Sequence, residues 1–178
     1  METISAVLTV NGVVIPARNE ANRLYQDGYG SFLNGGILLT LKSFEALYLI
    51  ERAKISVIDE TDRRGLVFRE LLQKYSGTDP YVWIKYIVYR DLRSRGFVVR
   101  EGPGLGIDFL VYERGTYGRR MPRYLIYAIW EGAPKSIEHL SGILDAAERE
   151  DKTLRIAVVD RRGEVVYYTL SEMDFIEE

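Results

Sequence analysis

The sequence of 178 residues contains no cysteine and a single histidine, His139. Without cysteine the chain can form no disulfide, thiolate zinc site, iron–sulfur cluster or cysteine nucleophile, and this composition is typical of a reducing compartment. With one histidine, a mechanism or metal site that needs two imidazoles cannot be built within one chain. We therefore expect a cytoplasmic protein that uses no metal and no cofactor.

Long apolar runs and common nucleotide or hydrolase motifs are also missing. No stretch approaches the roughly 18 apolar residues of a membrane span, and the N-terminal residues do not follow the pattern of a signal peptide. The P-loop, HExxH and GxSxG motifs are absent, which excludes the corresponding hydrolases. The glycine-rich stretch 102–106 precedes a predicted strand, whereas a dinucleotide site follows one, so we interpret it as a loop. Asp108 lacks the Glu-x-Lys strand that an acidic metal-dependent nuclease would need.

Neither sign of charge is in large excess, because the chain has 24 Lys and Arg residues and 26 Asp and Glu residues, for a net charge of -2. Attraction to nucleic acid therefore requires a local patch. One candidate patch combines basic and aromatic residues: Tyr112, Arg114, Tyr117, Arg119, Arg120, Arg123 and Tyr124. Guanidinium groups can bind phosphates and tyrosines can stack on bases, but a solvated loop paired with carboxylates would have the same composition. Both interpretations stay open at this level.

The hydrophobic content of 47% is sufficient for a substantial core, and the pattern predicts two small domains. Predicted helices cover 19–26, 43–52, 65–74 with Asp62 as cap, 81–95 and 136–149. Predicted strands cover a hairpin over 4–15 with its turn at Asn11 and Gly12, then 54–58, 97–100, 107–112, 124–129, 154–159 and 165–170. The stretch 28–36 is interpreted as a connector with a turn at Asn34 and Gly35, and the stretch 76–80 as the domain boundary. We expect an α+β N-terminal domain over 1–77 and an α/β C-terminal nuclease-like domain with a mixed sheet over 78–178.

Six stretches, taken in order, resemble the archaeal tRNA-splicing endonuclease family. They are NEANRLY at 19–25 with Tyr29 and Gly30, LTLKSFEALYLIERAKISV, YVWIKYIVYRDLRSRGFVVREG, GIDFLVY, RYLIYAIWEG and DKTLRIAVVDRRGEVVYY. Together they extend over nearly the whole chain and both domains of that family. The resemblance implies recognition of a bulged precursor tRNA and metal-independent intron excision that leaves 2′,3′-cyclic phosphate and 5′-OH ends.

The resemblance also implies catalytic roles. In this family a tyrosine acts as general base, a histidine as general acid and a lysine stabilises the charged phosphorus intermediate. Tyr112 matches the tyrosine and Lys152 matches the lysine. The position of the histidine, three residues before Tyr124, is Met121, whose thioether has no proton to donate. His139 lies on a predicted helix well beyond this loop and does not replace it.

A second departure concerns charge near the lysine. The helix before it usually carries basic residues in this family, whereas here it carries carboxylates, which repel RNA phosphates: Asp145, Glu148, Glu150 and Asp151. Some archaeal members assemble from two catalytic and two structural chains. We therefore predict that this chain is the structural subunit of a heterotetramer with a catalytic endonuclease subunit, with Tyr112 and Lys152 vestigial or supporting. The alternative is an active chain that uses Tyr112 and Lys152 with a different acid, such as a loop arginine or a water.

Residues for RNA binding and for assembly are predicted as well. The loop arginines Arg114, Arg119, Arg120 and Arg123 are the candidates for RNA contact. In the family an acidic loop between the last two strands inserts into a neighbouring subunit, and here this loop reads DRRGE. The predicted subunit interface comprises Asp160, Arg161, Arg162, Glu164, Val165 and Tyr167, although a plain charged hairpin turn would have the same sequence.

Overall fold

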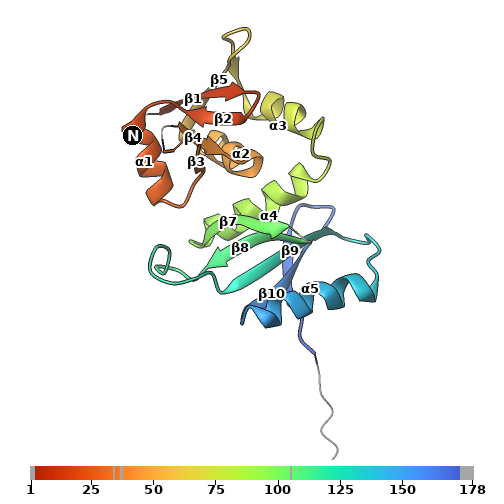
Figure 1. The fold of residues 1–178 in the computed structure, drawn as a ribbon. Helices are drawn as coiled ribbons and strands as arrows, with labels where there is room; N and C mark the ends of the chain where they lie inside the picture. Colours follow the sequence, from red (N-terminus) through yellow and green to blue (C-terminus); the bar gives the residue numbers. More distant parts are fainter. Residues whose placement is uncertain (1–2, 34, 37, 105, 173–178) are drawn as a thin grey trace, which may run out of the picture. The chain divides into compact units, whose positions relative to one another are not determined.

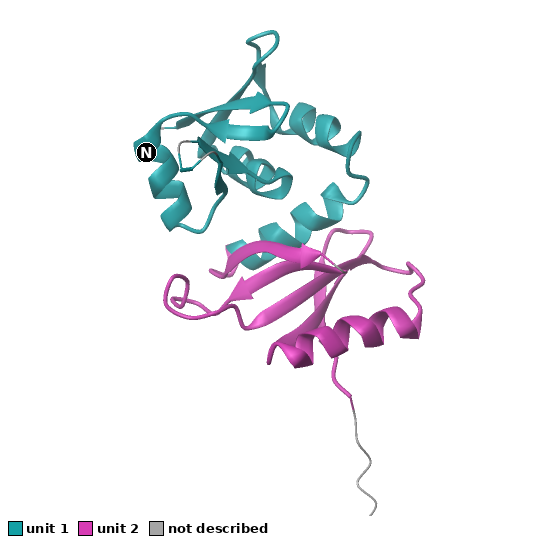
Figure 2. Cartoon of the chain, in the orientation of Figure 1, with its two compact units in different colours: residues 1–93 teal, residues 94–178 magenta. Residues whose placement is uncertain are grey.

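The computed structural model describes residues 3–33, 35–36, 38–104 and 106–172, and it divides into two compact units, residues 1–93 and residues 94–178 (Figure 2). The first unit contains one mixed β-sheet with several helices, and the described part of the second contains one mixed β-sheet with a single helix packed on it (Figure 1). The predicted fold class, an N-terminal α+β domain followed by a C-terminal domain with a mixed sheet, is therefore confirmed. Among the helices of the described residues, none combines the length and the apolar composition that a membrane span requires.

The first unit is built on a sheet with the strand order β3-β4-β2-β1-β5-β6, in which β1 and β5 run parallel and the other neighbours antiparallel. Its strands are β1 (Ile4–Thr9), β2 (Gly12–Ile15), β3 (Ser31–Leu33), β4 (Leu38–Leu41), β5 (Ile55–Asp59) and β6 (Gly65–Leu66), and its helices are α1 (Arg18–Gln26), α2 (Ser43–Glu51), α3 (Phe68–Ser76) and α4 (Val82–Ser94). Helix α2 is buried along most of its length, which makes it the centre of this unit.

The predicted hairpin over 4–15 is confirmed, but its turn lies one residue earlier than expected. Thr9 pairs with Gly12, so the two connecting residues are Val10 and Asn11. Gly12 adopts a φ of +104°, a conformation that side chains with a Cβ rarely take. The positive φ thus falls on the glycine at the start of β2.

The prediction of a plain connector over 28–36 is wrong, because β3 lies within it and β4 follows. Asn34, part of the predicted turn, lies outside the described residues. Gly30 has a φ of +67°, and a Cβ there would lie 2.8 Å from the Thr40 carbonyl oxygen. Its N–H donates to the buried carboxylate of Glu45 at 3.0 Å, and that carboxylate also accepts from the Lys42 N–H at 2.8 Å. The glycine therefore serves close backbone packing.

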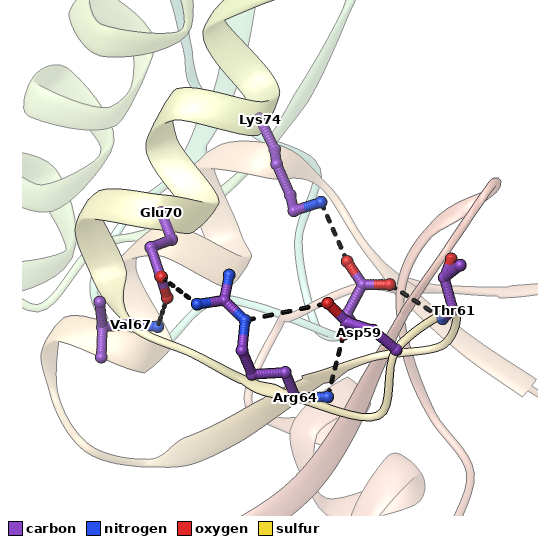
Figure 3. A network of polar contacts seen from close by, with 7 residues as sticks. Asp59, Thr61, Arg64, Val67, Glu70 and Lys74 are labelled. Atoms are coloured by element: carbon purple, nitrogen blue, oxygen red, sulfur yellow. Dashed lines mark hydrogen bonds and ion pairs between the residues drawn. The ribbon is translucent and has the colours of Figure 1, made fainter.

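The third helix begins at Phe68, three residues later than predicted, and Asp62 does not cap it. Gly65 and Leu66 instead pair with β5. The cap is supplied by Glu70, whose carboxylate accepts the Val67 N–H at 3.1 Å and binds Arg64 at 2.8 Å (Figure 3). Lys74 of the same helix binds Asp59 at 2.9 Å, which fixes α3 to the end of β5. Pairing of 65–66 with the preceding strand β5 has thus overridden a local helical pattern.

Helix α4 packs with the first unit. The Tyr89 ring lies 4.9 Å from that of Phe44 and 5.7 Å from that of Tyr48, and the Arg93 guanidinium lies 3.9 Å over the Tyr29 ring. The sequence pattern predicts a boundary at 77, before this helix, whereas the compact units divide at its last turn.

The second unit contains a sheet with the strand order β11-β10-β9-β8-β7, in which β9 and β10 run parallel. Its strands are β7 (Val98–Gly104), β8 (Ile107–Tyr112), β9 (Tyr124–Trp130), β10 (Thr153–Val159) and β11 (Val165–Thr169). Helix α5 (Ile137–Arg149) begins at the Ser136 cap and packs on one face of the sheet. There Ile143, Leu144 and Ala147 meet Leu125 and Leu154 in the core.

Residues 102–104 belong to strand β7, so the prediction of a loop over 102–106 is wrong for its first part. The pairing of β7 with β8 shifts register between Glu101 and Gly104. A Cβ on Gly102 would lie 2.2 Å from the Ile107 carbonyl oxygen, so only glycine fits in this irregular pair. Leu105 lies outside the described residues.

Candidate functional site

The ends of three neighbouring strands meet at one edge of the second sheet. Val111 of β8 pairs with Tyr124 of β9, and Tyr124 pairs with Thr153 of β10. The Arg123 N–H donates to the Val111 carbonyl at 3.0 Å, and the Thr153 N–H donates to the Arg123 carbonyl at 3.1 Å. Tyr112 at the end of β8 and Lys152 just before β10 therefore come to the same edge.

Tyr112 is half-buried, and its ring is fixed against the loop that follows it. The ring meets that of Tyr117 edge-on, with centroids 5.0 Å apart. A half-buried tyrosine at the end of a strand can act either as a structural anchor or as a reactive group.

Lys152 follows helix α5 in a Schellman motif. Asp151 takes a positive φ of 52°, the Lys152 N–H donates to the Ala147 carbonyl, and the Asp151 N–H donates to the Glu148 carbonyl, both at 3.0 Å. The Lys152 side chain is only 12% exposed, and its ammonium lies 2.5 Å from a carboxylate oxygen of Glu150. The cation is therefore present at this edge but already has a partner.

Met121 lies in the loop 113–123 and is 80% exposed. The loop is closed by its own hydrogen bonds, since the Glu113 carbonyl accepts from both the N–H and the hydroxyl of Thr116. The next residue, Pro122, is buried and holds the loop to the unit. The side chain at the position predicted for the acid thus points into solvent and carries no transferable proton.

The four loop arginines fall into two classes. Arg114 lies 5.2 Å over the Phe97 ring, and Arg123 pairs with Glu113 at 3.1 Å. Arg119 and Arg120 are exposed, and their backbone N–H groups both donate to the Thr116 carbonyl. Of the predicted RNA-binding residues, Arg119 and Arg120 therefore have the side chains most available to a phosphate.

His139 lies at the opposite end of strand β8 from Tyr112. Its ring packs against that of Tyr127 with centroids 5.4 Å apart. A Cβ placed on Gly106, the residue before β8, would lie 3.3 Å from His139 Cε1. Tyr112 is the last of the six residues of β8, so its Cα stands roughly 20 Å from that of Gly106 at 3.3 Å per residue. The one imidazole of the chain therefore cannot reach the strand edge that holds Tyr112 and Lys152.

Arg155 is a further cation near this edge that the sequence pattern does not single out. Its guanidinium lies 4.2 Å over the Tyr124 ring, and Arg123 approaches the same ring at 5.8 Å. The alternation of strand β10 places Arg155 on the same face as Thr153, and this alternation is the signal that could have found it. Two guanidinium groups thus flank one aromatic ring.

Further carboxylates are exposed along helix α5, which precedes Lys152. Asp145, Glu148 and Arg149 line an open hollow on α5, and all three are exposed. Within the described residues, no group of three or more histidine or acidic side chains is arranged to hold a metal ion.

The hairpin between β10 and β11 is organised by Asp160. One oxygen of its carboxylate accepts the N–H groups of Arg162 at 2.8 Å and Glu164 at 2.9 Å. These bonds, that of Glu164 first, hold the pKa of the Asp160 carboxyl below its ordinary value. Of the residues predicted for the interface, Asp160 is thus engaged within its own turn, whereas Arg161 and Arg162 are exposed.

Strand β11 presents different residues on its two faces. Val165 and Tyr167 are half-buried, and Arg95 lies 5.6 Å over the Tyr167 ring. Val166 and Tyr168, which the predicted interface does not include, are 51% and 57% exposed. An apolar residue is therefore open to solvent on an edge strand of the described sheet.

Comparison with known proteins finds matches to one family over both parts of the chain. Residues 4–72 match the family model of the tRNA intron endonuclease N-terminal domain, and residues 82–167 match that of the tRNA intron endonuclease catalytic C-terminal domain. The chain is 36% identical over 169 residues to a tRNA-splicing endonuclease of Methanococcus maripaludis, covering 95% of this chain and 94% of that protein.

Two more relatives carry the same name. A tRNA-splicing endonuclease of Thermococcus onnurineus is 36% identical over 86% of this chain and 87% of its own length. One of Methanococcoides burtonii is 38% identical over 87% of this chain, but only 43% of that longer protein is covered. The match extends over both units and nearly the full length of two relatives. The chain therefore belongs to the tRNA intron endonuclease family.

Proposed function

We propose that this chain is the structural, RNA-positioning subunit of a tRNA-splicing endonuclease, paired with a catalytic subunit that carries the missing histidine. The observation that carries the proposal is the place of His139. It is the only histidine of the chain, and it lies at the far end of β8 from the edge that holds Tyr112 and Lys152.

The cleavage chemistry explains why the absence of a histidine at this edge matters. In metal-free cleavage the 2′-oxygen attacks the phosphorus and the 5′-oxygen leaves, so one proton must be taken from the 2′-hydroxyl and one given to the leaving oxygen. In our proposal the Tyr112 hydroxyl stands where the base is needed, and Lys152 can stabilise the charged phosphorus. A proton donor for the leaving oxygen is missing, because the Met121 thioether has none. The cut can then be completed only in a partner's site.

RNA positioning is assigned to the loop 113–123. Arg119 and Arg120 are exposed there, and guanidinium groups bind phosphates through two parallel hydrogen bonds. Precursor tRNA is the ligand that the family membership favours. We place the assembled enzyme in the cytoplasm, as the absence of cysteine leads us to expect.

Cleavage of a bulged, intron-bearing precursor RNA in EDTA tests this proposal. The purified chain alone is expected to leave the RNA intact. A mixture with a histidine-bearing relative from the same source is expected to release the intron with 2′,3′-cyclic phosphate ends, and the two chains should co-elute in equal amounts.

The competing function is an active endonuclease that uses a different acid. Cleavage by the lone chain would establish it and would overturn the structural role. Cleavage rates of the Arg119→Ala and Arg120→Ala variants would then show whether a loop guanidinium takes part in cleavage. The rate of Lys152→Ala would show whether the Lys152 ammonium is needed.

A further inference from the structure

The ion pair between Lys152 and Glu150 is fixed by the backbone that carries both residues. Glu150 caps helix α5 and Lys152 stands two residues later, with Asp151 in the left-handed conformation between them. The two hydrogen bonds of the Schellman motif hold this turn to the last turn of the helix. The two side chains are therefore brought together locally, and no distant element is needed to keep them paired.

The surroundings of the ammonium restrict how a second anion can reach it. The Lys152 side chain is 12% exposed, whereas that of Glu150 is 55% exposed, so the carboxylate lies on the solvent side of the pair. A phosphate that approaches from solvent meets the carboxylate before it meets the ammonium. It must either displace Glu150 or bind beside a like charge, which is unfavourable.

Other carboxylates lie nearby without sharing this contact. Asp145, Glu148 and Asp151 are exposed, and the contacts described for Lys152 pair its ammonium with Glu150. Glu148 provides a matched comparison, since it belongs to the same helix end and carries the same charge. An effect of general charge would appear equally at Glu148 and Glu150, whereas an effect of the pair would appear at Glu150 alone.

We propose that Glu150 is a built-in competitor for RNA phosphate, which holds the Lys152 ammonium until a phosphate displaces it. Glu150 is thus a positioning residue that acts through Lys152. It lowers the affinity of this edge for RNA and, together with the absent acid at Met121, keeps the edge inactive in the free chain. The inference rests on the proposed function in one respect, the identity of the phosphate as part of an RNA.

The first experiment needs no RNA. Acetylation of Lys152 by acetic anhydride is followed by mass spectrometry while inorganic tripolyphosphate is added as the competing anion. In Glu150→Gln, we expect Lys152 to be acetylated faster than in the wild type when tripolyphosphate is absent. Tripolyphosphate should protect Lys152 from acetylation at a concentration roughly two- to fivefold lower than in the wild type. Glu148→Gln should match the wild type. Equal shifts in both variants, or none in Glu150→Gln, would overturn the inference.

The second experiment measures RNA affinity by fluorescence anisotropy with a labelled, bulged precursor RNA. Glu150→Gln should bind roughly two- to fivefold more tightly, and this gain should disappear when Lys152 is also changed to Met. A gain that survives in the Lys152→Met background would overturn the competition. Loss of RNA binding in every variant, with the tripolyphosphate result intact, would contradict the proposed function and leave the competitor role in place.

Folding is checked independently. Glu150 is more than half exposed and Gln preserves its volume, so the circular dichroism spectrum and the unfolding midpoint should be unchanged. Glu150→Ala serves as a second variant and should reproduce the phosphate result without any side-chain oxygen.

Discussion

In the function that we propose, Met121 is the residue that leaves the edge with Tyr112 and Lys152 without a general acid. Imidazole titrates near neutral pH and can give a proton to a leaving oxygen, whereas a thioether neither donates nor titrates. Met121 is exposed in a loop that is closed by its own hydrogen bonds. A substitution there changes the chemistry without disturbing a packed core.

We predict that Met121→His introduces cleavage into the lone chain. A positioned general acid typically contributes 10²- to 10⁴-fold in rate, so the variant should exceed the wild type by about that range. The measurement is single-turnover cleavage of the bulged precursor RNA in EDTA. Met121→Ala is the matched control and should stay inactive, and His139→Ala should leave the variant unaffected. A wild-type chain that cuts as fast as Met121→His would contradict the prediction.

At the scale of the element, the hairpin of β10 and β11 depends on one carboxylate. Asp160 organises the turn by accepting the N–H groups of Arg162 and Glu164. Its charge therefore serves its own hairpin first, and a substitution at Asp160 alters the shape of any surface that the hairpin presents. Glu164, Arg161 and Arg162 are the better positions for testing association by charge reversal.

We predict that Asp160→Ala loosens the turn, whereas Glu164→Ala does not. The amides of Arg162 and Glu164 should exchange with solvent faster in Asp160→Ala, as measured by hydrogen–deuterium exchange. The wild type should show the same change in acid. Because the folded pKa of Asp160 is lowered, its stabilisation is complete above the ordinary value of 3.8 and is lost as pH falls through the lowered pKa. Protection that does not change once the Asp160 carboxyl is protonated in the folded chain would contradict this account.

At the scale of the whole molecule, we propose that the edge of the second sheet formed by β11 is the surface used for assembly. Strand β11 ends the described sheet and exposes Val166 and Tyr168. An exposed apolar edge strand tends to pair with another chain. Association through this edge would also cover the apolar side chains.

We predict that Val166→Lys weakens association with the catalytic partner, because a lysine on an edge strand opposes pairing. The apparent mass of the mixture in light scattering should fall toward that of the separate chains, while the unfolding midpoint of the lone chain stays unchanged. Val165→Lys is the comparison and should lower that midpoint, since Val165 is half-buried. Association unaffected by Val166→Lys would contradict an interface at this edge.

The sequence predicts the second unit better than the first. Strand β8 has the predicted bounds, and helix α5 begins one residue after its predicted start, because alternation and a serine cap are local signals. Strands β3, β4 and β6 are short and lie in glycine-rich or charged stretches. They form because neighbouring strands offer backbone hydrogen bonds: β3 pairs with β4, β6 pairs with β5, and β4 also pairs with the more distant β2. Each is too short to show the alternation that predicts a strand.

The candidate site also has a part that the sequence predicts and a part that it does not. Tyr112, Met121 and Lys152 are identified by resemblance, and the strand register brings the ends that carry Tyr112 and Lys152 to one edge. The partners of these residues are not predictable from the sequence. Glu150 pairs with Lys152 because Asp151 adopts a left-handed conformation that usually belongs to glycine, so the turn has no clear sequence signal.

By itself, the sequence determined which chemistries this chain lacks. Composition fixes the absence of cysteine and the presence of one histidine, and no folding can supply a side chain that is missing. Only the tertiary structure decided where the remaining groups stand: His139 at the far end of β8, the Lys152 ammonium against Glu150, and Asp160 within its own turn. The physical reason is that an inventory of functional groups is a property of the chain, whereas distance and competition between charges arise only when the strands pair and the helix ends pack.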